Sequence, residues 1–261
     1  MNVGDIVAVI PAYNDQEGLE TTLRSLDRFG LAMIVAVDDG SEPPLEAPHD
    51  LSTPFKLIRH DKNKGAAAAR NTGLSVTKSD WVYFTDCGCI HQPDIFLSYS
   101  NASDSNVSAF IGPVVATTQG RLGTFYTEQG ILNPALFYSE DNIPEAVRIV
   151  TCNALVSKSA IDKVGYFDEK CETAEDADFG WRLSKVGKII WCKYAEIAHN
   201  FTESLDDFDS RFKRYGRGTR LISDKYNFGW TPQQFFISED IDLGKRRNKM
   251  LVEGFNSILE A

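Results

Sequence analysis

Four short apolar runs in the first 90 residues constrain the fold of this chain more than any other feature. The runs lie at 6–10, 33–37, 55–58 and 81–84. Apolar strands with little polar alternation are buried on both faces, and strands that alternate with helical segments form a parallel sheet covered by helices. We therefore predict an α/β fold with a mostly parallel, Rossmann-like sheet flanked by helices.

Each apolar run ends in a polar cluster. The clusters lie at 11–14, 38–41, 62–65 and 85–88. Because ligands bind beyond the carboxyl ends of strands in such sheets, we expect the four clusters to gather along one edge and form a site. Between the first two runs, Leu19, Leu23 and Leu26 recur at helical spacing and predict an amphipathic helix that closes near Gly30.

Two adjacent carboxylates, Glu175 and Asp176, precede a further run of helical periodicity. Thr173 and Asp176 have the spacing of a capping box, which predicts that a helix starts here. The helix dipole would favour the ionised carboxylates in the first turn. A carboxylate held ionised suits a general base that acts on a hydroxyl. The alternative is that Asp176 only caps the helix, since acids are common in first turns.

The motif series resembles that of family 2 glycosyltransferases with the GT-A fold. The resemblance covers residues 6–200 and rests on Pro-Ala-Tyr-Asn at 11–14, Asp-Asp-Gly-Ser at 38–41, Asn-Lys-Gly-Ala-Ala-Ala-Ala-Arg-Asn at 63–71, Phe-Thr-Asp at 84–86 and Ala-Glu-Asp at 174–176. It implies a nucleotide-sugar donor, an inverting sugar transfer and one carboxylate base, which would be Asp176. The acceptor would be a glycan, a lipid-linked molecule or a small molecule.

The resemblance also implies a donor site on the carboxyl-end clusters. Its candidate residues are Pro11, Ala12, Tyr13, Asp39, Lys64, Gly65, Arg70 and Asp86. Asp39 at a strand end can accept the imide N–H of uracil, which favours a UDP-sugar. Lys64 and Arg70 suit a diphosphate, as a point charge and as a fork for oxygen pairs. The alternatives are a solvated turn lysine and a helix-surface arginine.

The expected metal site departs from the family pattern. Relatives carry Asp-x-Asp after the fourth strand, whereas Gly88 stands here in place of the second aspartate. Asp86 and His199 could still hold Mn²⁺ or Mg²⁺ as a cofactor. Alternatively, basic residues neutralise the diphosphate without a metal, or Cys87 and Cys89 take a soft metal, although zinc sites use about four ligands. The broken motif also leaves a second function open, a nucleotide-sugar-binding protein with impaired catalysis.

The acceptor is expected in the region 110–160 and near the Glu-Asp pair. Candidate acceptor-binding residues are Asn153, Glu175 and Trp181, and Asn153 could equally belong to a plain polar turn. Four aromatic residues in this region suit sugar rings, although packing is the commoner fate of such side chains. They are Phe125, Tyr126, Phe137 and Tyr138.

We predict a GT-A domain over residues 1–205, with a donor half of about 1–100 and an acceptor half of about 101–205. A helical, basic extension over 206–261 would pack on it. Basic clusters at 211–220 and 245–249 could close over the diphosphate, meet an anionic acceptor, touch a membrane surface or form a solvated face. Gly216 and Gly218 predict a movable break rather than one long helix.

Charge and composition narrow the function classes. The net charge of −10 argues against nucleic-acid binding. No apolar run approaches the ~18 residues of a membrane span, and the first residues lack the pattern of a signal peptide. An odd number of cysteines, five, predicts reduced thiols. We expect a cytoplasmic protein, with peripheral membrane contact through the basic clusters as the alternative.

Overall fold

A seven-stranded sheet forms the centre of the computed structural model, which describes residues 1–102, 104–117, 119–130, 149–171, 173–200, 204–229 and 239–260. Its strand order is β3-β2-β1-β4-β8-β6-β9. The strands are β1 (Ile6–Ala12), β2 (Met33–Asp38), β3 (Phe55–Arg59), β4 (Trp81–Thr85), β6 (Val107–Ile111), β8 (Asn153–Ser157) and β9 (Lys188–Trp191). Strand β8 runs antiparallel to β4 and β6, and the other neighbouring pairs are parallel, which confirms the predicted mostly parallel sheet.

Helices cover both faces of this sheet, as the alternating pattern predicted. The helices of the described residues are α1 (Gln16–Asp27), α2 (Ala66–Ser75), α3 (Ile95–Asn101), α4 (Gly120–Gln129), α5 (Lys158–Val164), α6 (Glu175–Ser184), α7 (Leu205–Tyr226) and α8 (Ile241–Asn256), with short 3-10 turns at Val3–Asp5 and Ser257–Glu260. Helices α1 and α3 pack in one apolar core, and α2, α5 and α6 pack in a second core on the opposite face. Helix α1 confirms the amphipathic helix predicted from its leucines. Within the described ranges, no helix has an apolar stretch long enough to cross a membrane.

A second, smaller sheet lies beside the first, with strand order β5-β10-β7. It contains β5 (Cys89–His91), β7 (Val114–Ala116) and β10 (Ile197–His199). Strand β10 pairs antiparallel with β5, so that His199 lies opposite Cys89. The strand therefore brings His199 to the segment that follows Asp86.

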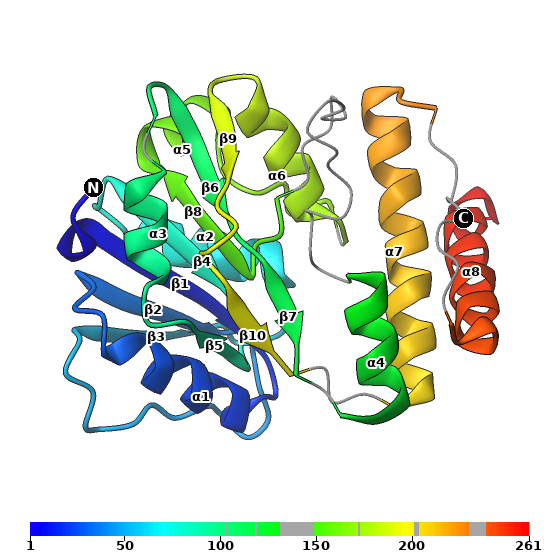
Figure 1. Cartoon of the computed structure of the whole chain (residues 1–261), viewed down its shortest axis with the longest axis horizontal. Helices are drawn as coiled ribbons and strands as arrows, with labels where there is room; N and C mark the ends of the chain where they lie inside the picture. Colours follow the sequence, from blue (N-terminus) through cyan, green and yellow to red (C-terminus); the bar gives the residue numbers. More distant parts are fainter. Residues whose placement is uncertain are drawn as a thin grey trace.

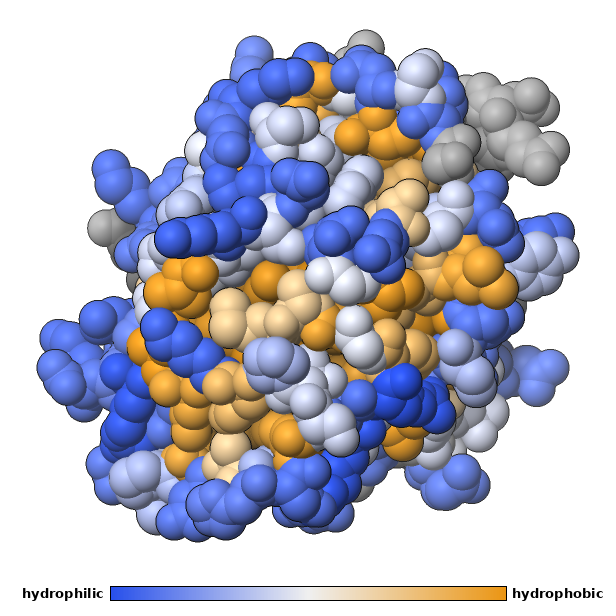
Figure 2. Space-filling model, turned by 90° about the vertical axis from the view of Figure 1, so that its left-hand side faces the viewer, coloured by the Kyte–Doolittle hydropathy of each residue, from blue (hydrophilic) through white to orange (hydrophobic). Residues whose placement is uncertain are grey.

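The carboxyl ends of the parallel strands point toward the C-terminal helices. In Figure 1 the chain begins on the left, where β1 also starts, and α4, α7 and α8 lie on the right. Figure 2 shows the left-hand face, with apolar residues across its centre and hydrophilic residues around them. Helices α4, α7 and α8 share a third apolar core of Phe125, Tyr126, Phe208, Phe212, Leu243, Met250 and Leu251. The C-terminal segment is therefore packed beyond the carboxyl edge of the sheet.

Helix α7 contradicts the predicted break at Gly216 and Gly218, because it continues from Leu205 to Tyr226. A Cβ atom on Gly216 would lie 2.1 Å from the carbonyl oxygen of Leu251 in α8. A Cβ atom on Gly218 would lie 2.8 Å from the Cβ atom of Ala174. The two glycines thus permit close packing on both sides of the helix, and this packing outweighs their low helix propensity.

The predicted capping box at the start of α6 is also wrong. The residue before the helix is Ala174, which has a left-handed backbone (φ 62°) and no side-chain cap. The Thr173 hydroxyl instead donates to the carbonyl oxygen of Arg214 at 3.3 Å. The Thr173 hydroxyl, which the local pattern had predicted to cap α6, therefore bonds to α7 instead.

Candidate active site

The four polar clusters meet at the carboxyl edge, as the sequence predicted. The Asp39 N–H donates to the carbonyl oxygen of Ala12 at 2.8 Å, and the Asn14 N–H donates to the Ser41 hydroxyl, also at 2.8 Å. The Cys87 thiol lies 3.6 Å from the carbonyl oxygen of Pro11. The loops after β1, β2 and β4 are thus joined directly. Tyr13, a predicted base-stacking residue in the first loop, is half exposed (50%) and open to a ligand.

Arg70 connects this edge to the Glu-Asp pair. Its guanidinium is 4% exposed, and its two terminal nitrogens donate to Asp86 Oδ1 at 2.9 Å and to Glu175 Oε1 at 2.6 Å. Burial alone would lower the pKa of Arg70, but the two carboxylates outweigh this effect and raise it. The alternative of a helix-surface arginine is therefore wrong. Arg70 joins two motifs that lie 105 residues apart in the chain.

Asp176 follows Glu175 in the first turn of α6 and is partly exposed. Burial and the neighbouring Glu175 raise the pKa of Asp176 to about 7, although Arg70 and the Ala177 N–H oppose the rise. The sequence had predicted a carboxylate that the helix dipole keeps ionised. That expectation is wrong, because desolvation and the like charge of Glu175 outweigh the dipole. Asp176 titrates near neutral pH, which suits a group that exchanges protons.

Asp39 holds the loop before α2 through its side chain. The Asp39 carboxylate accepts the N–H groups of Lys64 (3.0 Å to Oδ1) and Gly65 (2.8 Å to Oδ2). It also accepts a hydrogen bond from His60 Nδ1 at 2.6 Å. The Lys64 side chain itself is exposed and lies free of the sheet. Sequence analysis did not single out His60, although its position two residues after the third apolar run places it at the same edge.

The adjacent aspartate, Asp38, has a structural role. Its buried carboxylate accepts the N–H groups of Ser41 at 2.8 Å and Leu45 at 3.2 Å, and it forms an ion pair with Arg59. Burial opposes ionisation of Asp38, but these hydrogen bonds outweigh it and lower its pKa. Asp38 therefore stabilises the loop that follows β2, whereas Asp39 binds the backbone of the 62–65 loop.

The described residues do not form a ready site for a hard divalent cation. Asp86 is paired with Arg70. Burial lowers the pKa of His199, and the negative charge of Asp86 opposes part of this lowering. Among the residues that the structure describes, no cluster of three His, Cys, Asp or Glu side chains could hold a metal. Gly88 adds no ligand, and a Cβ atom there would have no neighbour within 4 Å. The described residues thus provide no preformed shell of oxygen ligands for Mg²⁺ or Mn²⁺.

The cysteines near Asp86 are poor candidates for a soft metal. Burial raises the pKa of Cys87 well above its usual value and that of Cys89 to about 12, which disfavours the thiolate that a metal binds. All five cysteines are free, as the sequence predicted.

Two of the three predicted acceptor residues have other surroundings. Asn153 is buried and makes four hydrogen bonds, accepting from the hydroxyls of Tyr83 and Tyr99 and donating to the carbonyl oxygens of Pro113 and Ala195. Its hydrogen-bonding capacity is therefore used within the fold, and it is neither an acceptor contact nor a plain polar turn.

Trp181 packs against the end of α7 and the residues that follow it. Its ring contacts Tyr226 and Phe228, with centroids 5.7 and 4.8 Å away. The aromatic residues Phe125 and Tyr126 are buried in the third core, so that packing is their role. Phe137 and Tyr138 lie outside the described residues. Of the predicted acceptor contacts, Glu175 alone lies beside Asp176.

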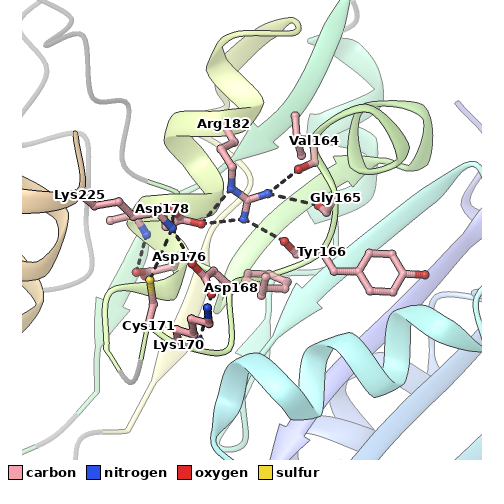
Figure 3. A network of polar contacts seen from close by, with 12 residues as sticks. Val164, Gly165, Tyr166, Asp168, Lys170, Cys171, Asp176, Asp178, Arg182 and Lys225 are labelled. Atoms are coloured by element: carbon pink, nitrogen blue, oxygen red, sulfur yellow. Dashed lines mark hydrogen bonds and ion pairs between the residues drawn. The ribbon is translucent and has the colours of Figure 1, made fainter.

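An ionic network centred on the buried Asp178 fixes α6 to α7 (Figure 3). Arg182 donates to Asp178 Oδ2 at 2.7 Å, and Lys225 of α7 approaches Asp178 Oδ1 at 2.6 Å. Lys225 also pairs with Asp168 at 2.7 Å, and the Tyr226 hydroxyl donates to Asp178. These hydrogen bonds lower the pKa of Asp178 although burial opposes them. The helix that carries Asp176 is therefore tied to α7 through the contacts of Lys225 and Tyr226 with Asp178.

The basic clusters of helices α7 and α8 are partly ion-paired. Ion pairs join Lys213 and Lys249 to Glu253, Arg220 to Asp224, and Arg246 to Asp209. Arg214 and Arg217 are exposed and form no ion pair within the part of the chain described here. These ion pairs engage four of the nine basic side chains in the two clusters, so that part of the two clusters is a solvated, ion-paired face.

A Rossmann-like sheet with polar loops gathered at its carboxyl edge and a carboxylate pair beyond it are the features of the GT-A class of proteins. The chain belongs to a known family within that class, because the sequence model described as Glycosyl transferase family 2 matches residues 7–165. The Glu-Asp pair lies beyond the matched range, and here the contact with Arg70 connects it to the matched motifs.

Two curated relatives illustrate this membership. The chain is 32% identical over 221 residues to the Pre-mycofactocin glycosyltransferase of Mycobacterium tuberculosis, in an alignment that covers 81% of the chain and 46% of that protein. It thus spans less than half the length of that relative. It is 24% identical to the Uncharacterized glycosyltransferase YwdF of Bacillus subtilis, over 94% of the chain and 93% of that protein.

Solved structures of low sequence identity share the fold. The mannosyltransferase PcManGT from Pyrobaculum calidifontis, in complex with GDP-Man and Mn²⁺, has a TM-score of 0.62 and 14% identity over 97% of this chain and 70% of its own. S. aureus TarS 1-349 in complex with UDP has a TM-score of 0.56 and 16% identity over 100% of this chain and 72% of its own. These likenesses support the GT-A fold.

Proposed function

We propose that this glycosyltransferase moves a sugar from a nucleotide-diphosphate donor to an acceptor hydroxyl, with inversion at the anomeric carbon and with Asp176 as the general base. The observation that carries the proposal is the bridge of Arg70 between Asp86 and Glu175. The bridge supports the proposal because it leaves only one side chain between Asp86 and the carboxylate pair. A base for the acceptor hydroxyl and a site for the donor thus share one edge.

In the proposed reaction Asp176 accepts the proton of the acceptor hydroxyl. The hydroxyl oxygen forms a bond to the anomeric carbon as the bond from that carbon to the diphosphate oxygen breaks, and the nucleoside diphosphate leaves with the electron pair. The pKa of Asp176, about 7, leaves a substantial fraction of the group ionised at neutral pH while keeping it basic enough to take the proton.

The donor would lie along the carboxyl-end loops. Asp39 and Tyr13 are the candidates for the nucleobase, and the exposed Lys64 is the candidate for the diphosphate. Arg70 would act by holding Asp86 and Glu175 in place, since both of its terminal nitrogens are already engaged. We favour a UDP-sugar because a carboxylate can accept the imide N–H of uracil. Among structural neighbours, one was solved with UDP and another with GDP-Man and Mn²⁺.

A second candidate is a nucleotide-sugar-binding protein with impaired catalysis, which Gly88 favours because it removes the second carboxylate of the motif. The carboxylate pair argues for turnover, since pure binding needs no base.

The test is the release of nucleoside diphosphate from UDP-glucose, UDP-galactose, UDP-N-acetylglucosamine and GDP-mannose, with water or simple glycosides as acceptors. Asp176→Asn should retain donor binding and lose turnover by roughly 10²–10⁴-fold, the usual contribution of a general base. Asp224→Asn, which changes an exposed aspartate of α7, is the control and should leave the rate unchanged. Near-normal turnover by Asp176→Asn would remove the base assignment. Donor binding without any turnover by the wild type would favour the binding protein.

A further inference from the structure

A chain of buried hydrogen bonds connects Asp39 at the sheet edge to helix α2. The Asp39 and His60 side chains are 4% and 6% exposed. His60 Nδ1 lies 2.6 Å from Asp39 Oδ1, and His60 Nε2 lies 2.9 Å from the Thr72 hydroxyl. Because an ionised carboxylate can only accept, the proton between His60 and Asp39 belongs to the imidazole. The ring is therefore fixed at both nitrogens and points its N–H at Asp39.

The Asp39 carboxylate accepts from three donors. These are His60 Nδ1 and the N–H groups of Lys64 and Gly65. The Lys64 N–H is shared between the two carboxylate oxygens, at 3.0 and 3.1 Å. A carboxylate offers about four acceptor positions, so three donors leave room for one further donor from a ligand. With three donors aimed at it, this carboxylate is an acceptor and not a donor toward that ligand.

The two loops beside Asp39 pack closely on one another. Gly40 packs so closely on the next loop that a Cβ atom there would lie 2.5 Å from the carbonyl carbon of Lys62. The loop after β2 is thus pressed against the 62–65 loop, with His60 at its base. The direction of the remaining acceptor position depends on the donor that His60 supplies.

We propose that His60 is a positioning residue that, through Asp39, selects the nucleobase of the donor. It favours bases that present a ring N–H, uracil or guanine, over cytosine and adenine. At the corresponding ring position cytosine and adenine carry a lone pair, which would face the carboxylate and leave both acceptors unpaired. A site built around a buried acceptor discriminates strongly against such a mismatch. This inference rests on the proposed function, in which Asp39 contacts the base.

The experiment is isothermal titration of the full chain with UDP, GDP, CDP and ADP at one fixed concentration of Mn²⁺. The wild type should bind UDP or GDP at least about 10-fold more tightly than CDP and ADP, the factor expected for an unpaired buried acceptor. His60→Leu removes the donor and should weaken the preferred nucleotide by about 10-fold while CDP and ADP change less, so that the preference narrows.

Two conservative variants and one control sharpen the test. His60→Asn retains an N–H near the position of Nδ1 and should restore most of the preference. Thr72→Val removes the outer hydrogen bond with little change in shape and should narrow the preference by a smaller factor. His49→Leu changes an exposed histidine of the loop before β3 and should leave all four affinities as they are.

Three results would overturn the inference. CDP or ADP binding as tightly as UDP and GDP in the wild type is one. Unchanged preference in His60→Leu and Thr72→Val, while Asp39→Ala loses it, is the second, and it would leave the proposed function intact. If His60→Leu does not fold by circular dichroism, an unchanged preference in Thr72→Val together with its loss in His60→Asn is the third. By contrast, absence of binding for all four nucleotides in the wild type would count against the proposed function itself.

Discussion

Replacement of Lys225 by methionine tests whether helix α7 holds the helix that carries Asp176. The Lys225 ammonium lies 2.6 Å from Asp178 Oδ1 and 2.7 Å from Asp168 Oδ2. The Asp178 side chain is fully buried, and that of Lys225 is 33% exposed. Loss of one partner of a buried ion pair costs about 3–5 kcal/mol. Because Lys225 is partly solvated and Asp178 keeps Arg182, we expect Lys225→Met to lower the free energy of unfolding by about 1.5–3 kcal/mol.

Lys213→Met is the matched control, since Lys213 lies on the same helix and pairs with Glu253 at 3.0 Å. Both side chains of this pair are more than 40% exposed (43% and 42%), so its loss should cost only about 0–1 kcal/mol. Urea unfolding of the two variants and the wild type gives both differences, provided that the slopes with urea agree. In a chain of this size, 1 kcal/mol moves the melting temperature by roughly 2–4 °C. Equal, small losses in both variants would refute the claim that Lys225 clamps α6 to α7.

Two further predictions concern the reaction site. Turnover should rise with pH through about 7, because Asp176 must be ionised to accept a proton and its pKa is raised to about 7. Rates of nucleoside diphosphate release from about pH 5 to about pH 9 measure this dependence, and a flat profile would contradict the assignment of Asp176 as the base. Gly88→Asp should bind Mn²⁺ at least about 10-fold more tightly than Gly88→Ala in nucleotide-free protein, because both carry the same strain at φ 76° and only one adds a carboxylate. Electron paramagnetic resonance of free Mn²⁺ gives both affinities, and equal binding would show that position 88 does not face a cation.

The parts of the fold that sequence analysis predicted correctly are those set by local pattern. Strands β1, β2 and β4 are apolar on both faces, and α1 has an apolar stripe, so that their periodicity alone identifies them. The meeting of the polar clusters followed from the same pattern, because parallel strands place their carboxyl ends at one edge.

The errors arise where a distant segment supplies the deciding contact. Thr173 has the spacing of a cap, but its hydroxyl bonds to Arg214, 41 residues further along the chain. Asn153 looked like a polar turn or a ligand contact, but two tyrosines and two carbonyl groups enclose it. Nothing in the local sequence around these residues records such partners.

The charge state of Asp176 is the most informative of these differences. A first-turn carboxylate is stabilised in its ionised form by about 0.3–1 kcal/mol at an exposed helix end, which is less than the ~1.4 kcal/mol that corresponds to one pKa unit. Desolvation and the adjacent Glu175 act on the same group with larger effect and raise its pKa to about 7. The desolvation depends on packing around the start of α6, where Gly218 of α7 lies against Ala174 and the Thr173 hydroxyl bonds to α7. Helix α7, which lies outside the range that matches the family, thus helps to set the environment of the proposed base.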